Sequence, residues 1–202
     1  LYQTVFFFLT FNLIDTGAQL FFREIYRFRP LIVSGQFDYI LARPVNPLFR
    51  VLLGGADMLD LITLPPLIIF TVVLITKISG IGPGQIILYI ILLGNGLLIA
   101  AAFHIAVAAL AVITTEIDHT IMIYRDLTQM ARVPLDVYNT SVQGFLTFII
   151  PVGIMMAFPV KILFGLLSWQ LVIYALLFGL IFFYFSLQLW KFSLTKYSSA
   201  SS

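Results

Sequence analysis

The stretch REIYRFRPLIVSGQFDYILARPVNPLFR, residues 23–50, follows directly on the first apolar run of the chain and separates it from the second. It contains five of the eleven Lys and Arg residues and three prolines. Long polar connections between apolar helices are uncommon unless they have a function. Lys and Arg translocate poorly across membranes, so an arginine-rich connection is expected on the cytoplasmic side. We therefore predict a cytoplasmic docking loop at residues 23–56, from which the orientation of the other segments follows.

The composition of the chain indicates its class. Hydrophobic residues make up 61% of the 202 residues and charged residues 10%, whereas soluble domains carry about 25% charged residues. The predicted fold class is therefore an all-α integral membrane protein, a polytopic helix bundle in a single transmembrane domain over residues 1–202. The net charge of +2 is too small to favour nucleic-acid binding. The absence of cysteine excludes disulfides and thiolate metal sites.

Five apolar runs are long enough to cross a hydrocarbon core of about 30 Å at about 1.5 Å per residue. The predicted spans are residues 1–22, 58–78, 85–115, 141–158 and 169–190. Because residue 1 lies inside an apolar run, we expect an N-terminal truncation that removed one span, so that five of six spans are visible. Trp169 and Trp190 are expected to anchor the two ends of the last span at the membrane interfaces.

Successive spans cross the membrane in opposite directions. With the loop at 23–56 inside, residues 79–84 and 159–168 fall outside and the C-terminal tail falls inside. Residues 116–138 also fall inside. They carry one apolar and one polar helical face, which predicts a cytoplasmic amphipathic segment at the inner membrane surface or at the end of the preceding span. This arrangement puts nine Lys and Arg residues inside and two, Lys77 and Lys161, outside. The asymmetry agrees with the cytoplasmic assignment.

Three polar residues of the first span, Asn12, Asp15 and Gln19, follow at spacings of three and four and so share one helical stripe. A carboxylate at the centre of a span costs about 2.5–3.5 kcal/mol on insertion scales, so Asp15 is expected to face protein or water. Two interpretations are open. The stripe lines a translocation path, or its side chains bond neighbouring helices and hold the bundle together.

The two histidines argue against an enzyme. His104 is alone in its apolar run, which favours a packing histidine that hydrogen-bonds across helices over a ligand or proton relay. His119 lies fifteen residues further on, roughly 22 Å along a helix at the standard rise. The two cannot share a metal ion on one unbroken helix, so a membrane-embedded enzyme is not expected.

Two stretches and the tail resemble a known family. SGQFDYILARPVNPLFRVLL, residues 34–53, resembles the segment G-x-(L/F)-D-x-x-L-x-R-P-x-N-P-L of ABC-2 type permeases of the uncharacterised-export class. RVPLDVYNTSVQGFLTFIIPVGIMMAFPVKILFG, residues 132–165, is similar to their P-L-x-V-Y segment and the Ile-Pro stretch that follows it. The tail LWKFSLTKYSSASS, residues 189–202, is similar to their short serine-rich C-terminus.

The resemblance implies an ABC-2 type permease fold of six helices, which pairs with a second permease copy or a paralogue in the lipid bilayer and works with a cytosolic ABC ATPase. In that family the loop between the second and third helices contacts the ATPase. Here it maps onto Gly35, Asp38, Arg43, Pro44 and Pro47. A short element bounded by prolines can transmit a rigid-body movement. The alternative is turn chemistry with snorkelling arginines, which explains the turns but not the length of the loop.

The expected function is the membrane-spanning permease subunit of an ATP-driven exporter in the cell membrane, with a cytoplasmic C-terminus. The chain has no phosphate-binding loop of the type G-x-x-x-x-G-K-[ST]. ATP and Mg²⁺ are therefore expected on the partner, and no cofactor on this chain. The alternatives are an ion-coupled secondary transporter and a non-transporting assembly or sensor subunit. Neither a basic nor an acidic pocket stands out, so the sequence does not indicate the substrate.

Overall fold

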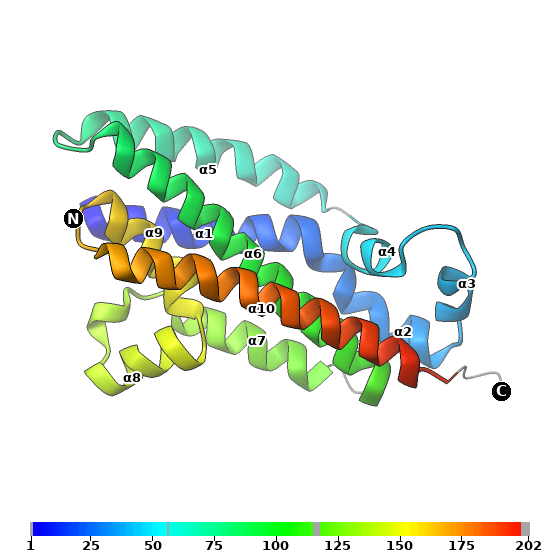
Figure 1. Cartoon of the computed structure of the whole chain (residues 1–202). Coiled ribbons are helices and arrows are strands. Elements are labelled where there is room, and N and C mark those ends of the chain that lie inside the picture. The colour runs from blue at the N-terminus through cyan, green and yellow to red at the C-terminus, as the bar shows by residue number, and fades with distance from the viewer. Residues whose placement is uncertain (1, 56, 115–117, 199–202) are drawn as a thin grey trace.

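The structure, a computed structural model, describes residues 2–55, 57–114 and 118–198. Over these residues the chain forms helices joined by turns, which confirms the predicted all-α class (Figure 1). The elements are α1 (Tyr2–Phe22), η1 (Arg23–Arg27), α2 (Phe28–Val33), α3 (Phe37–Leu41), α4 (Pro47–Leu53), α5 (Met58–Lys77), α6 (Pro83–Thr114), α7 (Asp118–Met130), η2 (Leu135–Val137), α8 (Thr140–Gly144), η3 (Phe145–Ile149), α9 (Val152–Leu163) and α10 (Trp169–Lys196).

The bundle has two ends, which lie at the left and right of Figure 1. The start of α1 and the turn between α5 and α6 lie at one end, called here the 79–84 end. Helices α2, α3 and α4 lie at the other, the platform end, and residues 28–53 are called the platform. Helices α6 and α10 run in the same direction between the two ends, because Asn95 contacts Ala175 and Phe103 contacts Phe182.

Helix α6 occupies the centre of the bundle, with α1, α9 and α10 packed against it. Small residues permit these close approaches. A Cβ on Gly96 would lie 2.9 Å from the backbone oxygen of Met155 in α9. The side chain of Asn95 is 6% exposed and donates Nδ2 to the backbone oxygen of Ala175 in α10 at 3.0 Å. Helices α6 and α10 are therefore joined by both packing and a buried polar contact.

Helix α5 is the most exposed of the apolar spans. Of its side chains, all of which are described, only Thr71 is buried. The helix continues through Pro65 and Pro66, so the prolines do not divide the span. Its apolar surface is available to lipid or to another helix. This explains why α5 is highly hydrophobic although it lies outside the core.

The placement predicted for residues 116–138 is wrong where the structure describes them. Helix α7 runs back beside α6, and its Tyr124 ring lies 4.9 Å from that of His104. The chain beyond it reaches the 79–84 end, where Asp136 accepts a hydrogen bond from Lys161 at 2.8 Å and shares a pocket with Gln3. The segment therefore crosses from the platform end to the 79–84 end. Residues 116 and 117 lie outside the described residues.

The predicted crossing at residues 141–158 is also wrong. Helices α8 and η3 meet α9 at a bend of 103° around Pro151. Because Asp136 before this pair bonds Lys161 near its end, the chain enters and leaves at the 79–84 end. The chain therefore enters and leaves this bent pair at the same end, and α7 carries it back from the platform end, as the parallel course of α6 and α10 requires. Among the described residues, the helices long and apolar enough to span a membrane are Tyr2–Val33, Met58–Lys77, Pro83–Thr114 and Trp169–Lys196, and α7 is not among them.

Hydropathy misassigned these two segments for one physical reason. Residues 151–160 are all buried, so their apolar character reflects contact with protein rather than a lipid-facing span. Helix α7 is amphipathic, and its polar residues Arg125, Asp126 and Gln129 are exposed beside the rest of the bundle. A helix that faces a polar cleft does not need the all-round hydrophobicity by which crossings are recognised.

Candidate functional site

The polar stripe of α1 lies on an accessible side of that helix. Asn12 is exposed and donates to the backbone oxygen of Phe8 at 2.7 Å, while Gln19 donates to Asp15 at 3.2 Å. These hydrogen bonds join atoms of α1 to one another. They leave the stripe oriented away from the core, as the translocation-path interpretation requires. The assignment of a path stays a prediction.

Helix α7 brings its charges to this stripe. Gln19, Arg23, Tyr26, Arg27 and Arg125 line a cleft of about 280 Å³ between the platform-end half of α1, η1 and α7. Asp15 lies within electrostatic range of Arg125 and of Arg132. The sequence analysis did not pair these residues, because it placed α7 at the membrane surface. No signal in the sequence pairs them, because the parallel course of α6 and α10 is known only once the helices are placed together.

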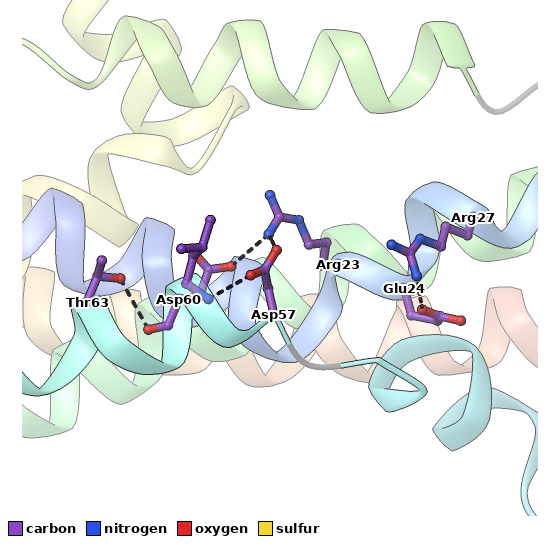
Figure 2. Close-up of polar contacts among 7 residues, drawn as sticks. Arg23, Glu24, Arg27, Asp57, Asp60 and Thr63 are labelled. Carbon is purple, nitrogen blue, oxygen red and sulfur yellow. Dashed lines mark hydrogen bonds and ion pairs between the residues drawn. The ribbon is translucent and has the colours of Figure 1, made fainter.

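Arg23 joins the end of α1 to the start of α5 (Figure 2). Its Nη1 donates to the carboxylate of Asp57 and lies 3.3 Å from Oδ2 of Asp60. Asp57 also caps α5 by accepting from the backbone N–H of Leu59 at 2.8 Å. Asp57 therefore has a structural role at the N-terminus of α5, and the ion pair adds a link between two spans.

Carboxylates partly balance the charge of the cleft arginines. Arg23 pairs with Asp57 and Asp60, and Arg27 lies 3.9 Å from Glu24 (Figure 2). Arg125 is within electrostatic range of Asp15. The cleft is therefore charged but not strongly cationic, so it does not by itself identify an anionic cargo.

His104 packs among aromatic rings at the depth of this cleft. Its Nδ1 lies 2.7 Å from the backbone oxygen of Ala100 in its own helix, and its ring contacts Phe22, Tyr26 and Tyr124. It is a packing histidine as predicted, but the expected hydrogen bond across helices is replaced by one within α6. Among the residues that the structure describes, no group of His, Asp and Glu is arranged to hold a metal ion. The side chain of His119 lies outside that description.

The predicted coupling residues lie on the turns of the platform. Gly35 has φ of +73° between α2 and α3, a conformation that favours glycine. Pro47 begins α4, where Asn46 caps the helix by accepting from Leu48 N–H at 3.0 Å. Arg43 and Pro44 are exposed in the turn between α3 and α4. The loop predicted at 23–56 is thus a series of short helices over its described residues.

Exposed apolar side chains lie beside these turns. Tyr39 is 73% exposed, Val45 53% and Phe49 61%. None of the three is among the predicted coupling residues, because the sequence gives no sign of which face of a short helix an apolar side chain occupies. Tyr39 shares a hollow with Arg43 and Arg50, a mixed apolar and cationic surface that is here called the outer platform surface. Phe49 instead lines an apolar groove with Leu98 of α6 and Leu187 of α10.

The opposite face of the platform is buried against α10. The Phe37 ring lies 5.0 Å from that of Phe28, 6.4 Å from Trp190 and 5.1 Å from Tyr197, measured between ring centroids. Trp190 is only 4% exposed, so the interface-anchor role expected of it is wrong. It packs against the platform instead. Trp169, 64% exposed at the other end of α10, has the exposure such an anchor needs.

Asp38 also faces this buried side. The Tyr197 hydroxyl donates to Oδ1 of Asp38 at 2.9 Å. Burial, and then the neighbouring Asp38 carboxylate, raise the pKa of Tyr197 to about 12, so the hydroxyl stays protonated at physiological pH. Of the predicted coupling residues, Asp38 is thus engaged within the chain, whereas Arg43 and Pro44 are exposed.

The comparisons with known proteins agree with this architecture. A family model described as "ABC-2 family transporter protein" matches residues 1–201. Neither the search of curated proteins nor the search of solved structures returned a match. The family match covers nearly the whole chain and agrees with a multi-pass helical membrane protein. The chain therefore belongs to the ABC-2 transporter family, whose members are membrane components of ABC transporters.

Proposed function

We propose that this chain is the permease subunit of an ABC exporter of the cell membrane and that it couples to a separate cytosolic ATPase through the platform. The observation that carries the proposal is the two-sided platform. One face is fixed on α10 by buried aromatic rings, and the other exposes Tyr39 and Val45 around Arg43. Exposed apolar groups with a polar rim are typical of protein interaction sites.

The distribution of positive charge supports a cytoplasmic platform. Without α7, which crosses, the platform end keeps seven of the nine cationic residues first assigned to the inside: Arg23, Arg27, Arg29, Arg43, Arg50, Lys191 and Lys196. Lys77 and Lys161 lie toward the other end. Lys and Arg are enriched in cytoplasmic connections, so the platform and the C-terminus face the cytosol in this proposal.

The transport path lies along the cleft between α1 and α7, completed by a second copy of the chain or a paralogue. Asn12, Asp15 and Gln19 contribute the α1 side and Arg125 the α7 side. Side chains that must be hydrated within a membrane are best accommodated next to a water-filled route. ATP and Mg²⁺ are held by the partner ATPase, and this chain transmits the conformational change.

The test is co-purification of the full-length protein with the ATPase co-expressed from its own host. Tyr39→Ala combined with Arg43→Ala, two residues of the outer platform surface, should abolish recovery of the nucleotide-hydrolysing partner. The control is Phe145→Ala, a 45% exposed ring at the 79–84 end, which should retain it. Asp38→Ala is unsuitable here, because it also removes the acceptor of the Tyr197 hydrogen bond. Recovery of no ATPase with the unmodified protein would refute the proposal and favour an assembly or sensor subunit.

One observation favours a second candidate, an ion-coupled secondary transporter. Asp15 of α1 lies within electrostatic range of Arg125 of α7, and several intramembrane charges are typical of such transporters. The two functions differ in energy source. Transport by reconstituted protein that persists without ATPase, and stops when the ion gradients are dissipated, would establish the second candidate.

A further inference from the structure

The end of α10 is joined to the platform by contacts between residues far apart in sequence. Helix α3 has only five residues, and a helix of that length is not stable without tertiary contacts. Its Phe37 is fully buried between Phe28, Trp190 and Tyr197. The next residue, Asp38, accepts the hydrogen bond from Tyr197, 159 positions away along the chain. Trp190 near the end of α10 and Tyr197 directly after that helix therefore hold α3 in place.

The same helix connects this contact to the bundle core. Helix α10 is unbroken from Trp169 to Lys196, and over its 28 residues it extends roughly 42 Å at the standard rise. Near its other end Ala175 accepts from the buried Asn95 of α6. A stiff helix fixed to the platform at one end and to the central span at the other transmits displacement with little loss, because packed helices move as rigid bodies.

We propose that Tyr197 and Trp190 are positioning residues, which bind the platform to the last span so that movement of the platform is delivered through α10 to the 79–84 end. This inference rests on the proposed function, since the movement originates in the ATPase. It adds a second route of coupling. The first route runs along the chain from the platform into α1 and α5, whose ends are also joined by the ion pair between Arg23 and Asp57. The hydroxyl of Tyr197 is the part of the contact that can be removed without changing the packing of its ring.

The first test measures whether Tyr197 holds the platform. Tyr197→Phe removes one hydrogen bond, and amide hydrogen exchange in residues 37–41 should become about fivefold faster, as expected for loss of a typical net hydrogen bond. Tyr184→Phe is the matched control, because Tyr184 is a 57% exposed tyrosine of the same helix. It should leave exchange in α3 unchanged. Equal exchange in the unmodified protein and in Tyr197→Phe would overturn the inference.

The second test measures delivery to the far end. The chain has no cysteine, so a single spin label at Leu166→Cys, an exposed position after α9, reports on the 79–84 end. The probe is a non-hydrolysable ATP analogue added to the permease–ATPase complex in lipid nanodiscs. We expect the nucleotide to change label mobility with Tyr197 and to change it by less than half as much with Tyr197→Phe, while Tyr184→Phe matches Tyr197.

The outcomes separate this inference from the proposed function. A complex that forms with Tyr197→Phe and responds fully to nucleotide refutes the positioning role and leaves the proposed function intact. Absence of any ATPase complex with the unmodified protein refutes the proposed function, and the inference with it. A complex that forms normally but responds weakly only in Tyr197→Phe supports both.

Discussion

Replacement of Gly179 by alanine should destabilise the bundle through a single neighbour. A Cβ at this position would overlap Oδ1 of Asn95 and lie 2.9 Å from its Cγ and 3.2 Å from its Nδ2. The amide must therefore move as a unit, and its hydrogen bond to Ala175 is lost. Overpacking costs about 1–3 kcal/mol and an interhelical hydrogen bond in a membrane protein contributes about 0.6 kcal/mol. We expect Gly179→Ala to lower the free energy of unfolding by about 2–3 kcal/mol.

A double-mutant cycle tests this reasoning. In an Asn95→Ala background the amide is absent, so the added methyl group at position 179 should cost less than about 0.5 kcal/mol and the coupling energy should be about 2 kcal/mol. Gly94→Ala is the control within α6, because no atom lies within 4 Å of the added Cβ. Reversible unfolding in mixed SDS and detergent micelles supplies the free energies. The same cost for Gly179→Ala in both backgrounds would refute the contact.

Three further predictions concern the topology, an ion pair and a titrating group. Single cysteines at Val137 and Tyr39, both more than 70% exposed, should react with a membrane-impermeant maleimide from opposite sides; reaction from one side would restore the surface placement of α7. Arg23→Gln should lower stability by no more than about 1 kcal/mol, because Arg23 and Asp57 are 40% and 27% exposed, and exchanging their charges should restore it in thermal unfolding. The stabilisation that Tyr197 contributes as a protonated donor should be full below pH 10 and lost as the pH rises through about 12, so the melting temperatures of the protein and of Tyr197→Phe should converge over that interval.

The fold class followed from the sequence because hydrophobic composition is a summed property. A chain with 61% hydrophobic residues cannot be a typical soluble domain, whatever its detailed packing. The bounds of α1, α5 and α6 were predicted closely, since each is a long run that must be apolar on most of its surface, whereas α10 continues to Lys196 beyond its predicted end at residue 190.

The segment that returns the chain between α6 and α10 could not be assigned from hydrophobicity. Hydrophobicity does not distinguish residues covered by lipid from residues covered by protein, so the buried α9 was taken for a span and the polar α7 for a surface helix. The parallel course of α6 and α10 resolved the assignment, because two parallel helices require a crossing between them. That constraint exists only once both helices are placed together.

The candidate site was likewise predictable only where it depends on local spacing in the sequence. By itself the sequence determined that residues 23–56 form a proline-bounded, arginine-rich element and that Asn12, Asp15 and Gln19 share a stripe, because both depend on local spacing. Only the tertiary structure decided that α7 brings Arg125 to this stripe and that Tyr197 engages Asp38. Contacts between residues 159 positions apart depend on how the helices pack, and helical periodicity within one segment carries no information about its neighbour.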